Sequence, residues 1–131
     1  MEQEIDRCTV VVADWEMKCC GTPFKVGDTI EWFVSKSESE KLLVDMGNID
    51  FDYDHHSFDN KNLFKIKGNV VNIFAIHYAY KKVSENPDFM VPISGISVEI
   101  KEADGWDEDI EGKELCCYYV CLENVNLIEK E

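Results

Sequence analysis

The sequence predicts a mainly β fold: a small antiparallel β-barrel or sandwich of about five to seven short strands with little helix. Short stretches rich in β-branched and aromatic residues recur along the chain, and Gly, Pro, Asn or Asp residues separate them. Helical spacing is confined to at most one short turn at residues 39–44. At 131 residues the chain has the usual length of one domain, so we expect residues 1–131 to form a single domain.

The first half of the chain contains two of the predicted strands. Residues 8–15 include a run of valines, which favour strands. Residues 29–34 alternate so that one face of the strand is clearly apolar. A turn at residues 26–28 leads into this second strand, and residues 36–60 after it are polar and acidic.

The second half of the chain predicts four more strands. Residues 63–67 and 70–80 are predicted as separate strands, because Gly68 and Asn69 between them are typical of turns. Residues 84–95 contain two prolines and predict a connection. The remaining predicted elements are strands at residues 95–101 and 115–122 and an acidic loop at residues 102–114.

The last predicted strand is apolar on both of its faces. Residues 115–122 consist of leucine, cysteine, tyrosine and valine and carry no charge. Such a strand either lies in the centre of a sheet and is covered on both sides, or it pairs with a second copy of the chain. We therefore expect a monomer or a weak dimer.

The charge of the chain limits the partners that it can bind. The sequence has 27 acidic and 13 basic residues, a formal net charge of −14. Proteins bind nucleic acids and anionic membranes through lysine and arginine, so we expect neither as a partner. Arg7 is the only arginine, which disfavours an enzyme that clamps phosphate or carboxylate groups. A strongly negative field instead favours a basic protein partner.

The N-terminal residues and the six cysteines indicate a reducing compartment. Residues 1–6 are acidic, whereas a secretory signal begins with basic residues and continues with an apolar stretch. Four of the cysteines form adjacent pairs, and neighbours in a strand point to opposite faces, which disfavours a disulfide framework. We therefore expect a cytoplasmic protein in which all six thiols are reduced.

Residues 15–28 have a distinctive pattern, Trp-x-x-x-Cys-Cys-Gly-x-Pro-Phe-x-Val-Gly-Asp. Its first glycine and its proline predict a tight turn. Trp15, Phe24 and Trp32 supply large apolar side chains that would pack under such a turn. The pattern resembles the opening element of DUF6578, a bacterial family of small proteins of unknown function. The resemblance implies membership of the family and no particular activity. From the residues alone, the element is most simply a corner that closes a barrel.

An alternative interpretation places a thiol- or metal-dependent site at this element. Cys19 or Cys20 would be exposed as a reactive thiol or a ligand, and His55 and His56 would supply further ligands or a base. The spacing differs from that of zinc fingers and ribbons, in which a few residues separate paired cysteines. His77 lies in an apolar strand pattern, and we interpret it as a core or edge histidine with satisfied hydrogen bonds. No cofactor is expected.

The sequence favours a binding module over an enzyme. It contains no glycine-rich phosphate loop, serine elbow or His-Glu-x-x-His element. Two acidic loops, residues 45–59 and 102–114, combine carboxylates with aromatic side chains, a common composition of interfaces. We expect the second loop to be exposed and mobile, with its tryptophan either anchoring a partner or folding onto the barrel as a lid. The predicted partner surface consists of Tyr53, Phe58, Trp106, Asp107 and Asp109.

Overall fold

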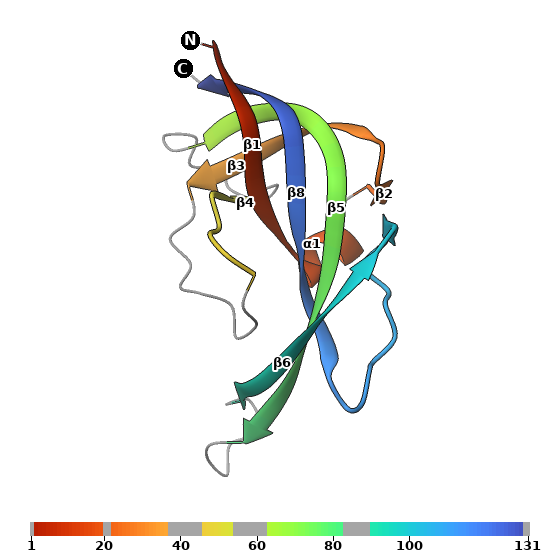
Figure 1. Cartoon of the computed structure of the whole chain (residues 1–131). Coiled ribbons are helices and arrows are strands. Elements are labelled where there is room, and N and C mark those ends of the chain that lie inside the picture. The colour runs from red at the N-terminus through yellow and green to blue at the C-terminus, as the bar shows by residue number, and fades with distance from the viewer. Residues whose placement is uncertain (1, 20–21, 37–45, 54–62, 83–89, 130–131) are drawn as a thin grey trace.

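The computed structural model describes residues 2–19, 22–36, 46–53, 63–82 and 90–129 (Figure 1). Most of these residues lie in strands, which confirms the predicted mainly β class. None of the helices in the described part of the chain is long and apolar enough to cross a membrane. The elements in chain order are β1 (Glu2–Ala13), α1 (Asp14–Cys19), β2 (Phe24–Lys25), β3 (Thr29–Lys36), β4 (Phe51–Tyr53), β5 (Leu63–Lys82), β6 (Met90–Ile100), β7 (Glu102–Ala103) and β8 (Glu114–Glu129).

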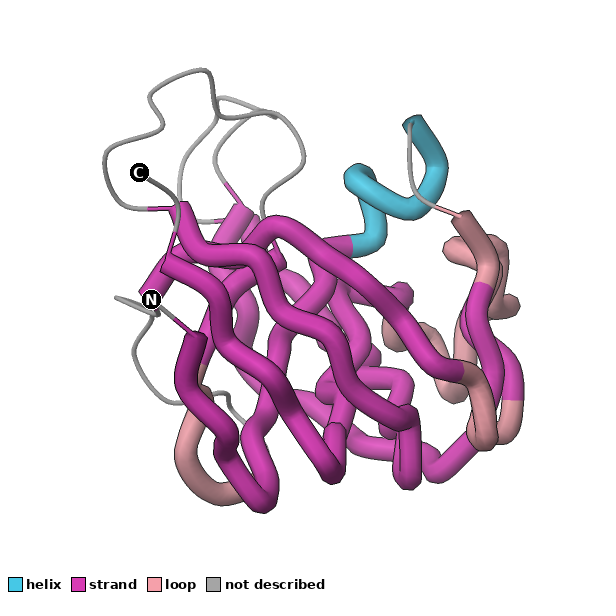
Figure 2. The backbone as a smooth tube through the Cα atoms, turned by 90° about the horizontal axis from the view of Figure 1, so that it is seen from above, coloured by secondary structure: helices cyan, strands magenta, loops and turns pink. Residues whose placement is uncertain are grey.

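The strands close into a barrel-like ring. β8 pairs with β1 along one edge and with β5 along the other, and the first part of β5 pairs in turn with β3. β4 joins β3 to β1 and completes the ring. The pairings in the ring are antiparallel, as predicted, except that the short β4 runs parallel to β1. Figure 2 shows α1 at the outside of these strands.

β6 extends the sheet beyond the ring. It pairs with the second half of β5, from Ile73 to Lys82. The end of this hairpin projects beyond the other strands in Figure 1, while β8 pairs with β5 as far as Tyr78. After β6, the short β7 pairs with β2 and leads into the loop before β8.

β8 is a central strand, and apolar side chains cover both of its faces. Tyr118, Val120 and Leu122 belong to the main core, which also contains residues of β1, β3 and β5 and therefore fills the ring. Cys117 and Tyr119 belong to a second apolar cluster on the opposite face. The chain thus covers both faces of this strand by itself, which is the first of the two arrangements that its sequence predicts.

β5 is one continuous strand, where the sequence predicts two strands separated by a turn at Gly68 and Asn69. The chain does not turn there. Instead, its pairing with β8 shifts register twice between residues 67 and 72. Such bulges bend a strand. Gly68 and Asn69 therefore lie where β5 curves around the ring, and they do not form a turn. A Cβ added to Gly68 would lie 3.1 Å from Cγ2 of Val125, which is a close approach that favours glycine.

Three other boundaries differ from the prediction. β1 begins at Glu2, well before its predicted start, because its polar first half pairs with the end of β8. The predicted first strand ends in a helix that begins at Asp14. β6 begins at Met90, inside the predicted connection, and includes Pro92. Proline is tolerated there because β6 is an edge strand of the described sheet. The predicted helical turn at residues 39–44 lies outside the described residues.

Candidate functional site

The residues of the predicted partner surface lie in two separate places. Trp106, Asp107 and Asp109 belong to the loop between β7 and β8, whereas Tyr53 ends β4, on the opposite side of the molecule in Figure 1. Phe58 lies outside the described residues. The predicted residues therefore belong to two candidate surfaces.

Most residues of the alternative thiol or metal site cannot be placed. Cys20, His55 and His56 lie outside the described residues, and Cys19 ends α1 with a side chain that is not described either. Within the described part of the chain, no group of three or more His, Cys, Asp or Glu side chains is arranged to hold a metal ion. The alternative interpretation stays a prediction.

Residues 104–113, which we call the acidic loop, are held to the core by Tyr118. The buried Tyr118 hydroxyl donates a hydrogen bond to Oδ1 of Asp107 at 2.7 Å and accepts one from the Gly105 N–H at 2.8 Å. Burial and the bond to Asp107 raise the pKa of Tyr118, so the phenol keeps its proton and remains a donor. One core side chain thus positions the loop at two of its residues.

The tip of the acidic loop is a tight turn. Ile110 and Lys113 exchange two backbone hydrogen bonds, of 2.9 and 2.8 Å. Glu111 and Gly112 between them have φ angles of 50° and 77°. Positive φ at both central residues is the geometry of a type I′ turn, which joins antiparallel strands tightly. The loop therefore ends in a defined reverse turn; its expected mobility stays a prediction.

Trp106 stands at the surface of the acidic loop. Its side chain is 68% exposed, the highest value among the exposed large apolar side chains. The backbone N–H of Trp106 donates a hydrogen bond to Oδ1 of Asp104 at 2.8 Å, and this bond shapes the backbone beneath the side chain. This exposure favours the interpretation of Trp106 as a partner anchor over its interpretation as a lid.

The acidic loop lines one side of a cavity of about 330 Å³, which we call the His77 cavity. The other side comes from the projecting β5–β6 hairpin. The volume is near the lower end of the range of small-ligand sites. The lining residues are Ala75 and His77 of β5, Val98 and Ile100 of β6, and Asp107, Glu108, Asp109 and Ile110 of the loop.

His77 is buried but incompletely paired. It is 1% exposed, as the interpretation of a core histidine requires, yet its Nδ1 has no hydrogen-bond partner among the described residues. An unpaired buried polar group costs about 1–3 kcal/mol, and proteins rarely keep one without a reason.

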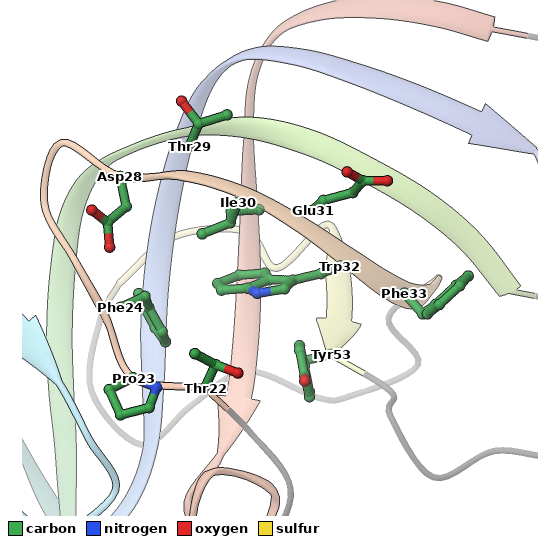
Figure 3. A pocket seen from close by; sticks show the side chains of 10 residues that line it. All are labelled: Thr22, Pro23, Phe24, Asp28, Thr29, Ile30, Glu31, Trp32, Phe33 and Tyr53. Carbon is green, nitrogen blue, oxygen red and sulfur yellow. The ribbon is translucent and has the colours of Figure 1, made fainter.

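A second cavity, of about 420 Å³, lies between the residues before β2 and the strands β3 and β4 (Figure 3). Trp32 lines it between Phe24 and Tyr53 and makes edge-to-face contacts with both, at ring-centroid distances of 5.0 and 5.4 Å. The two carboxylates at its border already have partners within the chain. Glu31 pairs with a lysine of β5, and Asp28 accepts a hydrogen bond from a backbone N–H of its own turn.

The distinctive element at residues 15–28 closes a corner of the ring. The Gly27 N–H donates to the carbonyl of Val70, and the Val70 N–H donates to the carbonyl of Asp28, both at 2.9 Å. Gly27 has a φ of 98°, a conformation that glycine adopts without strain. These bonds join the element to β5 at the bulge described above, so residues 24–28 have a structural role.

The four cysteines whose side chains are described, Cys8, Cys116, Cys117 and Cys121, are free thiols. This agrees with the predicted reduced state for these four. A hydrogen bond from Cys117 lowers the pKa of Cys116, and a second bond from Tyr80 acts in the same direction. The bond to Cys116 and burial raise the pKa of Cys117. Cys116 is therefore the more acidic thiol of the adjacent pair.

The family of the chain follows from its sequence as a whole. A protein-family model described as a family of unknown function (DUF6578) matches residues 6–124. The chain belongs to the DUF6578 family. The match confirms the resemblance carried by residues 15–28, and in this DUF6578 protein it extends from β1 into β8. Neither a curated protein nor a solved structure gives a significant match to the chain.

Sequence reasoning missed the His77 cavity of this DUF6578 protein. One sign was available: His77 follows the small Ala75 on the same face of a strand, which leaves space beside the imidazole. The loop carboxylates could not be assigned to that space from sequence. Their position depends on the hydrogen bonds of Tyr118, which joins segments that are 11 and 13 residues apart in the chain.

Proposed function

We propose that this protein is a binding module that recognises a basic protein partner through its acidic loop. The observation that carries the proposal is Trp106, which is 68% exposed on a loop that Tyr118 holds in place. A tryptophan on an ordered backbone offers a large apolar contact at small entropic cost. Tryptophan is also among the residues that contribute most to the affinity of protein interfaces.

The charge around Trp106 supports a basic partner. Four exposed carboxylates share the loop with it: Asp104, Glu108, Asp109 and Glu111. They belong to a chain with a formal net charge of −14. Such a field accelerates the approach of a positively charged protein and disfavours acidic competitors.

We place this binding in the cytoplasm and assign it to a monomer or a weak dimer. The free thiols of Cys8, Cys116, Cys117 and Cys121 support a reducing compartment. The covered faces of β8 support a chain that is stable without a second copy.

Affinity capture with charge variants tests the proposal. The wild-type protein, Glu111→Gln/Glu114→Gln and a control, Glu4→Gln/Asp6→Asn, serve as baits in a lysate of the cells that produce the protein. Both variants remove two negative charges from exposed positions, the first at the acidic loop and the adjoining first residue of β8 and the second on β1. The captured protein is identified by mass spectrometry, and its association with each bait is then measured at several salt concentrations.

The proposal predicts that the captured protein is basic. Its association should be slower and less salt-dependent with Glu111→Gln/Glu114→Gln, and unchanged with the control. Equal association rates with the two variants would contradict a role of the acidic loop. Capture of no protein, or of an acidic one, would contradict the proposed partner class.

A further inference from the structure

The second cavity, which we call the Trp32 cavity, is bordered by aromatic side chains from separate parts of the chain. Phe24 belongs to β2, Trp32 to β3 and Tyr53 to β4. The ring plane of Trp32 is inclined by 73° to that of Phe24 and by 89° to that of Tyr53. Figure 3 shows Phe24 and Tyr53 on either side of Trp32, with Thr22 facing it, whereas Phe33 stands apart from this group. The three rings therefore border one space like the sides of a box.

The core holds these rings in place but leaves part of them accessible. Trp32 and Tyr53 are half-buried, whereas Phe24 is only 4% exposed and closes the inner end of the box. The ring of Tyr118 packs edge-to-face against Phe24 at a centroid distance of 6.3 Å. The volume of the cavity, about 420 Å³, lies within the range of small-ligand sites. A ligand can therefore enter a site whose walls are already formed.

Aromatic walls set at right angles suit a cation that has no N–H groups. The faces of aromatic rings carry partial negative charge, so several rings around one space attract a positive group. The ammonium group of lysine is strongly hydrated, and it loses its hydrogen bonds to water when it enters such walls. A quaternary ammonium group spreads its charge over methyl groups, which pack directly on ring faces. It loses less hydration and gains the same attraction.

The charge at the border of the Trp32 cavity also favours a cation. Asp28 and Glu31 both line the cavity. Glu31 forms an ion pair with Lys65, which balances its charge. Asp28 accepts its hydrogen bond from the neutral backbone N–H of Lys25, so this bond leaves the negative charge in place. The formal net charge of −14 adds a field that attracts cations and repels anions.

We propose that the Trp32 cavity binds a quaternary ammonium group. The group can belong to a free small molecule such as choline or to a trimethylated lysine of another protein, since both present the same head group. The inference is independent of the proposed function, because no residue of the acidic loop lines the Trp32 cavity.

Choline and its uncharged analogue, in which a carbon atom replaces the nitrogen, test the site in the wild-type protein. The two compounds have the same shape, and only choline carries a charge. Binding to the full chain is followed by NMR through the indole N–H signal of Trp32, with the signal of Trp106 as the reference. Choline should shift the Trp32 signal and leave the Trp106 signal in place. It should bind at least roughly tenfold more tightly than the analogue.

Two variants locate the binding site. Tyr53→Leu removes one ring of the box and should weaken choline binding roughly fivefold. Phe51→Leu is the matched control, because Phe51 is also half-buried on β4 but borders a different cavity together with Phe64. Its affinity for choline should equal that of wild type. Asp28→Asn keeps an oxygen that can accept the backbone N–H and removes the charge, so it should weaken binding of choline and leave that of the analogue unchanged.

A third compound, N-acetyl-trimethyllysine methylamide, distinguishes the two sources of the group. Tighter binding of this compound than of choline would support the site and assign it to a methylated protein. Tighter binding of choline would support the site and assign it to a free small molecule. Equal affinities would support recognition of the head group alone.

Several results would overturn the inference. Equal binding of choline and its uncharged analogue would show an apolar cavity without a preference for charge. A shift of the Trp106 signal without one of Trp32 would place binding elsewhere. Equal affinities of Tyr53→Leu and Phe51→Leu for choline would remove the rings from the site. If Tyr53→Leu does not fold, unchanged choline binding by Asp28→Asn overturns the inference instead. None of these results bears on the acidic loop, whose partner is captured and measured separately.

Discussion

Tyr118 connects the core to the candidate site at the scale of single residues. Its ring packs edge-to-face against Phe24 inside the ring of strands, at a centroid distance of 6.3 Å, while its hydroxyl reaches the acidic loop. The sequence does not distinguish Tyr118 from Tyr119, because both fit an apolar strand. Which of the two faces the interior is set by the register of β8, and register depends on the neighbouring strands.

The Tyr118→Phe variant should loosen the acidic loop. It removes the two hydrogen bonds of the hydroxyl and keeps the ring. We expect the free energy of unfolding to fall by about 1–3 kcal/mol, because one bond is made to a carboxylate. We also expect amide hydrogen exchange at Gly105 to become faster. Tyr119→Phe is the matched control, since its hydroxyl donates to the carbonyl of Asn48 instead. Gly105 exchange that is the same in wild type and Tyr118→Phe would contradict the anchoring role.

The Cys116 thiol should react faster than the thiols of Cys117, its neighbour in the chain, and Cys8 of β1. Cys116 is half-buried and its pKa is lowered by the hydrogen bond from Cys117. Cys117 and Cys8 are each only 4% exposed, and burial contributes to a raised pKa in both. Limited alkylation with iodoacetamide at neutral pH, followed by peptide mass spectrometry, should find Cys116 labelled before Cys117 and Cys8. Earlier labelling of Cys117 or Cys8 would show that this assignment of the acidic thiol is wrong.

The predictions for single side chains succeeded where composition decides and failed where contacts decide. The exposure of the carboxylates around Asp109 follows from their density in the sequence. The burial of His77 follows from the apolar strand that contains it. Its unpaired Nδ1 does not, because hydrogen-bond partners come from whichever segments the fold brings near.

At the scale of elements, β3 and β8 were predictable because their patterns are local. The alternation in residues 29–34 predicts one buried face, and the uncharged residues 115–122 predict two. β5 and β6 were less predictable, because Gly68 and Pro92 are tolerated for reasons that lie in neighbouring strands. Gly68 allows a close approach to β8, and Pro92 lies on an edge strand.

The short helix α1 was missed although its start carries a sign. Asp14 and Glu16 lie in its first turn, and negative charge stabilises the N-terminal end of a helix. The preceding run of valines predicts a strand that continues through the same residues. A helix of six residues has too little sequence to outweigh that pattern.

The Gly27→Ala variant should weaken the corner that joins β2 and β3. Nothing lies within 4 Å of a Cβ added to Gly27, but its φ of 98° disfavours any residue with a side chain. The cost should therefore be backbone strain of about 1–2 kcal/mol in the free energy of unfolding. Urea denaturation measures it, with Lys25→Ala as an exposed control in the same element. A Gly27→Ala protein as stable as the control would contradict the conformation of this turn.

At the scale of the whole molecule, the mainly β class follows from local composition, whereas the closure of the ring does not. β4 completes the ring next to β1, and the Asp50 carboxylate before it accepts a hydrogen bond of 2.9 Å from the Thr9 N–H. These residues are 41 positions apart. Pairings between residues so far apart in the chain depend on the complete fold. The sequence alone therefore does not distinguish a barrel from a sandwich.

Stability should fall at alkaline pH because several buried acidic groups keep their protons only in the folded state. Burial and the Asp50 carboxylate raise the pKa of Cys8 to about 12, whereas an unfolded thiol titrates near about 8.5. The stabilising contribution of Cys8 is therefore complete below about pH 8.5 and is lost as the pH rises toward 12. Tyr118 acts in the same direction from a higher pH.

Urea unfolding at about pH 7.5 and about pH 10.5 measures this effect. The free energy of unfolding should fall between the two conditions, and the fall should be smaller by about 2–3 kcal/mol in Cys8→Ala. The comparison uses the change with pH within each protein, so the packing lost in the variant cancels. An identical fall in both proteins would show that Cys8 is not the group responsible.

The role of Trp106 tests the central claim, that the acidic loop binds a partner, most directly. The measurement compares wild type and Trp106→Ala in two properties of the same preparations: the free energy of unfolding and the dissociation rate of the captured basic protein. The account predicts a change in unfolding free energy below about 0.5 kcal/mol, because the side chain is 68% exposed. It also predicts markedly faster dissociation, because a central aromatic contact is lost. A clearly destabilised Trp106→Ala protein that releases the partner at the wild-type rate would place Trp106 in the core and contradict the claim.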